Sequence, residues 1–191
     1  MKRLNVLLLA GLMIFSLNSC KKGCIDPYAK NYNSKKKKDN GSCTYYSTVT
    51  LHSIDVKKIP SKNSNGHLWD DGLDNDTDND NSYPDLYVWF KAEGGYSLKP
   101  TIYYETIDPL NVNINFTLDP VLSTDEWKND KGFWVYFEEV DYNNGAFYEP
   151  IDSVLVKPFD KNGSTDAHRF RDTLQVVDGE IEFTANMSWN D

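Results

Sequence analysis

Apolar and polar residues alternate along the chain from Thr48 onward, and no sustained helical periodicity appears in this part. Eight runs follow the two-residue period of a strand, and clusters of Gly, Pro, Asn and Asp separate them. The runs lie at residues 48–56, 86–91, 101–106, 112–118, 133–137, 153–156, 173–177 and 181–189. Short strands joined by turns predict an all-β fold, an antiparallel eight-stranded β-sandwich.

One short helix is predicted among these strands, at residues 123–127. Ser123 or Thr124 would cap it, and Glu126 follows in its first turn. No internal repeat accompanies the strands, so we expect them to form one domain, from residue 47 to residue 191.

The first 19 residues have a different character. Lys2 and Arg3 precede an apolar run at residues 6–17, which is shorter than the ~20 residues of a membrane-spanning helix. This pattern predicts a secretory signal peptide. The run ends in Leu-Asn-Ser-Cys, which resembles the lipobox of bacterial lipoproteins and implies that Cys20 carries the lipid. We therefore expect a lipid-anchored protein of the bacterial cell envelope, at the outer membrane; the alternative is an ordinary signal peptide with no lipid at Cys20.

Two further cysteines, Cys24 and Cys43, remain once Cys20 is assigned to the lipid. The compartment beyond the inner membrane is oxidising, so we expect these two to form a disulfide. In the chain-entropy description, such a bridge stabilises its loop by roughly 3 kcal/mol.

The residues around these cysteines read G-C-x-D-x-x-A-x-N-Y-N at 23–33 and D-x-G-S-C-x-Y at 39–45. They resemble a short disulfide module of Bacteroidota surface and secreted proteins, which makes residues 20–46 a lipidated, disulfide-stapled segment. Because the segment has too little apolar surface for its own core, we expect a rigid spacer; a recognition element is the alternative. The sequence departs from the module at Lys35 to Lys38, where we expect a solvated loop rather than a contact with anionic lipid.

The region from residue 47 to residue 191 resembles the C2 domain family. The first strand has alternating apolar residues and is followed by Ile59-Pro60, as in that family. The segment Asp85-Leu86-Tyr87-Val88 resembles the D-P-Y-V of the family, with Leu86 in place of proline. The strand from Phe133 runs out into Glu139 and Asp141, where C2 domains carry a D-x-D pair. The resemblance implies a C2-like sandwich with calcium at one end.

An acidic loop also predicts a calcium site, because seven carboxylates fall within residues 70–85. Crowded carboxylates repel one another unless a cation compensates them, and oxygen ligands suit Ca²⁺. In one arrangement, several loops share the ion. Its ligands would be Asp78, Asp80, Asp85, Glu139 and Asp141.

A second arrangement keeps the calcium ion within the loop itself, in a spacing that resembles an EF-hand-type calcium loop. Its ligands would be Asp74, Asp76, Asp78, Asp80 and Asp85. The loop departs from that pattern at Asn79, which stands where the EF-hand has glycine. The third possibility is a solvated acidic loop that binds no metal.

Composition and motifs argue against an enzyme and against nucleic acid as a partner. The formal net charge is -9, and removing Lys2 and Arg3 with the signal peptide makes it more negative still. The three histidines lie in no zinc pattern, and neither a nucleophile motif nor a phosphate loop is present. We therefore expect a binding or interaction module for a protein or glycan partner. The alternatives are a carbohydrate-binding accessory protein and a purely structural spacer.

The tryptophans distinguish two of these functions. Trp69, Trp89, Trp127 and Trp134 could line a platform for sugars, but we expect most of them to pack in or against the sheets. A glycan-binding protein should present aromatic side chains along one exposed face, whereas an interaction domain should keep them in its core.

Overall fold

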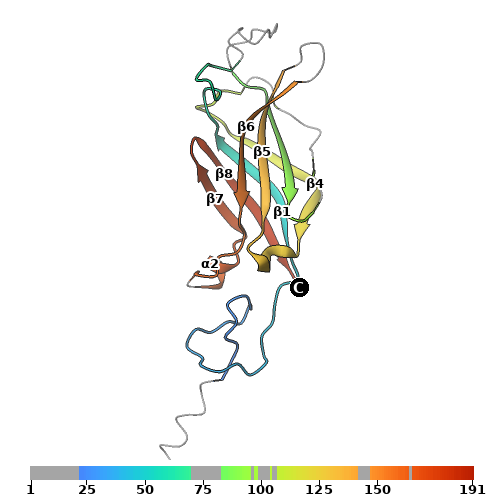
Figure 1. The fold of residues 1–191 in the computed structure, drawn as a ribbon, viewed down its shortest axis with the longest axis vertical. Coiled ribbons are helices and arrows are strands. Elements are labelled where there is room, and N and C mark those ends of the chain that lie inside the picture. Colours follow the sequence, from blue (N-terminus) through green and yellow to red (C-terminus); the bar gives the residue numbers. More distant parts are fainter. Residues whose placement is uncertain are drawn as a thin grey trace, which may run out of the picture. The chain divides into compact units, whose positions relative to one another are not determined.

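A computed structural model describes residues 22–69, 83–95, 97–98, 104, 107–141, 147–163 and 165–191 (Figure 1). The chain divides into two compact units, one up to Tyr46 and one from Ser47 to Asn190. The C-terminal Asp191 groups with the first unit. In the described ranges, no helix has the length and apolar character needed to cross a membrane.

The second unit is a sandwich of two four-stranded antiparallel sheets (Figure 1). One sheet has the order β4-β1-β8-β7 and the other has the order β3-β2-β5-β6. The strands are β1 (Thr48–Lys58), β2 (Leu86–Ala92), β3 (Ser97–Leu98), β4 (Ile114–Thr124), β5 (Phe133–Asp141), β6 (Phe147–Val156), β7 (Thr173–Asp178) and β8 (Ile181–Asn190). The predicted all-β, eight-stranded fold is confirmed.

The core lies between the sheets and is built from every second residue of the long strands. In β8, Ile181, Phe183 and Ala185 are fully buried, and the residues between them are half-buried. In β5, Phe133 and Phe137 follow the same rule. Because successive strand residues point to opposite faces, this alternation sends one set into the core and the other to the outer face of each sheet.

Seven of the eight predicted runs overlap observed strands, namely β1, β2 and β4 to β8, although β4 begins at Ile114 and runs on to Thr124. Of the remaining run, at residues 101–106, only Tyr104 is described, and it forms an isolated bridge to Leu86. The predicted helix at 123–127 is wrong in its bounds, because Ser123 and Thr124 are the last residues of β4. A 3₁₀-helix, η1 (Glu126–Asn129), follows, and the Thr124 hydroxyl accepts a hydrogen bond from the Glu126 amide at 3.1 Å.

An aromatic cluster closes the end of the sandwich where β5 begins. Trp127 of η1 is completely buried, and its ring lies 5.3 Å from Phe159, 5.9 Å from Phe170 and 5.1 Å from Trp189, measured between centroids. The short helix α2 (Asp166–Arg169) precedes Phe170, and the Thr165 hydroxyl caps it by accepting the His168 amide hydrogen bond. These rings fill a volume that neither sheet could close alone.

Polar side chains bond across the outer face of the sheet β4-β1-β8-β7. Asp55 in β1 accepts hydrogen bonds from Asn115 Nδ2 of β4 at 2.7 Å and from Asn186 Nδ2 of β8 at 2.9 Å. The first of these bonds, helped by the second, lowers the pKa of the Asp55 carboxyl. Asp55 therefore joins three strands through its charged form.

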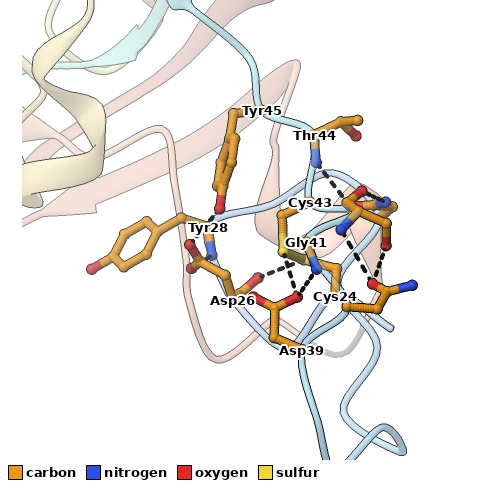
Figure 2. The surroundings of a disulfide bond; sticks show 11 residues. Cys24, Asp26, Tyr28, Asp39, Gly41, Cys43, Thr44 and Tyr45 are labelled. Carbon is orange, nitrogen blue, oxygen red and sulfur yellow. Dashed lines mark hydrogen bonds between the residues drawn. A yellow bond between two sulfur atoms is a disulfide. The ribbon is translucent and has the colours of Figure 1, made fainter. Parts of the chain in front are cut away.

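The first unit is held by the disulfide between Cys24 and Cys43, whose Cα atoms are 4.9 Å apart (Figure 2). The predicted pairing is confirmed. Asp26 accepts the Tyr28 amide at 2.9 Å and the Tyr45 hydroxyl at 2.8 Å, so it ties both ends of the module together. This hydrogen bond to Asp26 raises the pKa of Tyr45.

Asn31 makes the second cross-tie of the module. Its Nδ2 donates to the Ser42 carbonyl at 2.6 Å, and its Oδ1 accepts from the Thr44 amide at 3.1 Å. In the turn before Cys43, the Asp39 carboxylate accepts the Gly41 amide at 2.9 Å (Figure 2). The polar positions of the module therefore serve its own backbone, which is what a segment without an apolar core requires.

Candidate functional site

The start of β2 and the end of β5 bring predicted calcium ligands to one end of the sheet. Asp85 directly precedes β2, and its carbonyl oxygen accepts a hydrogen bond from the Val140 amide at 3.1 Å. Val140 lies between Glu139 and Asp141, the last acidic residues of β5. The antiparallel register, which sets Leu86 opposite Glu139, therefore holds the three acidic positions on neighbouring strands.

Glu139 is the most deeply placed of these residues. Only 2% of its surface is exposed, and its position has the same parity as the core residues Phe133 and Phe137. Directly opposite it in β6 stands Glu149, which is half-buried. Two carboxylates facing each other on one sheet face repel, and a bound cation would relieve this repulsion.

The other predicted ligands lie outside the described residues: these are Asp74, Asp76, Asp78 and Asp80. For Asp141 the backbone is described, in register with Phe147, but the side chain is not. Within the described ranges, no group of three or more His, Cys, Asp or Glu side chains is placed to hold a metal ion. Cys20, the predicted lipid site, also lies outside the described residues.

A second feature is a strip of aromatic side chains on the outer face of the sheet β3-β2-β5-β6, which we call the aromatic strip. Its members are Tyr87, Trp89, Trp134, Tyr136 and Tyr148. Trp89 and Tyr136 stand opposite each other and stack almost in parallel, with centroids 3.7 Å apart and an interplanar angle of 3°. Tyr148 is 43% exposed, and the other four are half-buried.

Polar groups border the aromatic strip. Glu138 stands opposite Tyr87, and Lys91 stands opposite Trp134. The other sheet has a polar outer face, on which Asp55, His52 and Ser188 form cross-strand hydrogen bonds. The two faces of the sandwich therefore differ in chemistry: among the described residues, the flat aromatic surface with hydrogen-bonding groups beside it lies on the sheet β3-β2-β5-β6.

Two of the four tryptophans considered for a sugar platform are in the interior, as expected. Trp69 is 2% exposed and donates from Nε1 to the Pro60 carbonyl at 2.9 Å, and Trp127 belongs to the aromatic cluster. Trp89 and Trp134 instead belong to the aromatic strip. The signal for this was in the sequence, because Trp134 and Tyr136 occupy the positions between the core residues of β5.

One histidine, His52, lies close to a serine hydroxyl in the sheet β4-β1-β8-β7. His52 Nε2 lies 2.8 Å from the Ser188 hydroxyl, a distance suited to a base and a nucleophile. Both residues, however, lie on strands of the sheet β4-β1-β8-β7, whose outer face also carries the hydrogen bond between Asn186 and Asp55. The pair is accounted for as one more cross-strand contact of this sheet.

Comparison with known proteins gives no family. Neither a protein-family model nor the sequence of a curated protein matches this chain. Among solved structures, the chain is similar to human GIVD cytosolic phospholipase A2, determined in complex with methyl gamma-linolenyl fluorophosphonate inhibitor and terbium chloride. The identity is 14% and the TM-score 0.37, and the match covers 76% of this chain but 18% of the phospholipase.

Proposed function

We propose that this chain is a lipid-anchored envelope protein whose C2-like sandwich is a binding module with a calcium site where β2 begins and β5 ends. The observation that carries the calcium site is the backbone contact between Asp85 and Val140, which holds Asp85 beside Glu139 and Asp141. The buried position of Glu139 supports it, because a carboxylate is removed from water at lower cost when a cation lies beside it. The anchor at Cys20 rests on the sequence pattern.

Calcium titration of the processed chain tests this function. Calcium should raise the melting temperature, because an ion that binds only the folded state stabilises it by about 2.7 kcal/mol at 100 times its dissociation constant. Sites of this kind outside the cell work at ~10⁻⁴–10⁻³ M. No heat and no thermal shift at millimolar calcium would contradict the calcium site.

Substitutions separate the two arrangements of ligands. For a site shared between loops, Glu139→Gln and Asp85→Asn should weaken calcium binding to a similar degree in isothermal titration. For a self-contained loop, Glu139→Gln should have little effect, and Asp74→Asn should remove binding. Asp172→Asn is the matched control, because Asp172 is exposed and precedes β7 at the other end of the sandwich.

The aromatic strip favours a second candidate, binding of a carbohydrate. Sugar rings present flat C–H faces that pack on aromatic rings, and their hydroxyls would find Glu138 and Lys91 at the edge of the strip. We therefore propose a glycan as the alternative ligand of the sandwich. It requires no contribution from the acidic end.

A pull-down with insoluble polysaccharides tests the glycan candidate. Cellulose, starch, mannan and peptidoglycan are suitable probes. If one of them is bound, Trp134→Ala should weaken binding by about 2 kcal/mol, roughly thirtyfold, because buried aromatic anchors dominate such contacts. His52→Ala on the other outer face is the control and should leave binding unchanged. Retention of the bound polysaccharide by the Trp134 variant would count against the strip.

A further inference from the structure

The first unit carries a charge opposite to that of the sandwich. Residues 22–46 contain six lysines and two aspartates, a net charge of +4. Residues 47–191 contain eleven basic and 27 acidic side chains, a net charge of -16. A basic segment on a strongly acidic protein concentrates the attraction for anions on one small surface.

The fold of the module gathers this positive charge at the start of the chain. Lys22 forms a parallel bridge with Lys38, and the Gly23 amide donates to the Lys38 carbonyl at 3.0 Å. The methylene stem of Lys36 packs on Gly23 so closely that a Cβ there would lie 2.8 Å from its Cγ. The lysine run at 35–38 is therefore fixed beside Lys22, two residues after Cys20.

Four of these lysines are available for an external contact. Lys22, Lys35, Lys37 and Lys38 are exposed, and in the part of the chain that the structure describes none of them forms an ion pair. The polar residues Asp26, Asn31 and Asp39 serve the backbone and side chains of the module instead. We call these four side chains the lysine cluster.

We propose that the lysine cluster binds the anionic phospholipid headgroups of the membrane that holds the Cys20 anchor; this inference rests on the lipid anchor of the proposed function. It replaces the solvated loop expected from the sequence, because the fold sets the lysine run beside Lys22. Two facts select this partner: the charge of the cluster, and its place beside the segment that leads to Cys20. Each lysine near an anionic bilayer strengthens the association roughly fivefold, over a range of about one Debye length. The acidic sandwich is repelled by the same surface.

Vesicle sedimentation with the unanchored chain, residues 21–191, tests the cluster without the lipid. This chain retains the disulfide between Cys24 and Cys43 and the whole of the sandwich. It should bind vesicles of phosphatidylcholine mixed with phosphatidylglycerol more tightly than vesicles of phosphatidylcholine alone. Binding should vanish at about 1 M salt, where the Debye length falls to about 3 Å.

A variant with all four cluster lysines changed to glutamine should bind the anionic vesicles on the order of several hundredfold more weakly, because the four fivefold contributions multiply. The matched control changes four exposed lysines of the sandwich to glutamine, namely Lys58, Lys62, Lys128 and Lys161, and should bind as well as the parent. An intact disulfide and an unchanged melting temperature verify that each variant is folded. Equal binding to both kinds of vesicle, or an equal loss in the control, would overturn the proposal.

A measurement on the full chain in its host distinguishes failure of the lipid anchor from failure of the lysine cluster. Parent and Cys20→Ala chains are compared by detergent partitioning, a measurement in which the lysine cluster plays no part. If the parent chain partitions with detergent but the unanchored chain ignores anionic vesicles, the anchor stands and the lipid contact of the cluster is wrong. If the unanchored chain binds anionic vesicles and the parent chain fails to partition, the anchor is wrong and the basic surface stands.

Discussion

Replacing Trp127 by alanine is expected to destabilise the sandwich by about 3–5 kcal/mol. The indole is completely buried and touches three other aromatic rings, so its removal leaves a large cavity at the end of the sandwich where η1 lies. The surrounding rings come from two segments: Phe159 and Phe170 lie on the connection between β6 and β7, and Trp189 lies in β8. They can move only a little to fill the space, which keeps the cost at the upper part of this range.

Chemical denaturation followed by circular dichroism measures this effect. A domain of this size should lose roughly 2–4 °C in melting temperature for each kcal/mol. Trp89→Ala is the control, since Trp89 is half-buried on the outer face and its loss opens no interior cavity. If the two variants were equally stable, the cluster around Trp127 would not be what closes the sandwich.

The long strands could be predicted because their surroundings impose a simple rule. In β5 and β8 one face meets the core and the other faces outward, so apolar and polar residues alternate along the sequence with a period of two. The strand β6 extends further than its predicted run at 153–156. Pro150 and the register shift opposite Phe137 and Glu138 break the alternation there, although the strand continues.

The short elements could not be predicted in this way. β3 consists of Ser97–Leu98, which is too short to display a period. η1 and α2 are single turns, and what places them is the packing of Trp127 and Phe170 against each other. The local sequence shows the capping residue Thr165, but it does not show the tertiary contact that determines where the helical turn forms.

The two candidate sites also differ in how far the sequence predicts them. Pairing of β2 with β5 places Asp85 beside Glu139 through backbone hydrogen bonds. The resemblance in strand order and spacing to C2 domains was therefore enough to predict that these two positions lie close together. The aromatic strip depends on which face of the sheet is covered. The expectation that most tryptophans pack in or against the sheets did not assign Trp134 to a face, and the parity of Trp134 in β5 decides it.

Gly132→Ala is expected to cause the second large loss of stability, for a different reason. A Cβ at this position would lie 2.0 Å from the Val156 carbonyl oxygen and 3.0 Å from the carbonyl carbon. Both atoms belong to the backbone of β6, so neither can turn away as a side chain would. Relief requires β5 and β6 to separate at the first pair of their register, Phe133 opposite Val156.

Gly132 is also tied to the turn after β2. Its amide donates to a Glu93 carboxylate oxygen at 2.9 Å, and its carbonyl accepts from the Glu93 amide at 3.0 Å. Moving Gly132 away from β6 would therefore strain the contact with Glu93 as well. We expect a loss of about 3 kcal/mol or more in unfolding free energy, at the upper end of the cost of overpacking.

Gly179→Ala provides the comparison that isolates the steric effect. Gly179 has a positive φ of 55° and no atom within 4 Å of the added Cβ, so the change costs backbone strain alone, about 1 kcal/mol. Denaturant titration of both variants should give the larger loss for Gly132. Equal losses would mean that β5 and β6 can part at Val156 without cost, against the close approach that Gly132 permits.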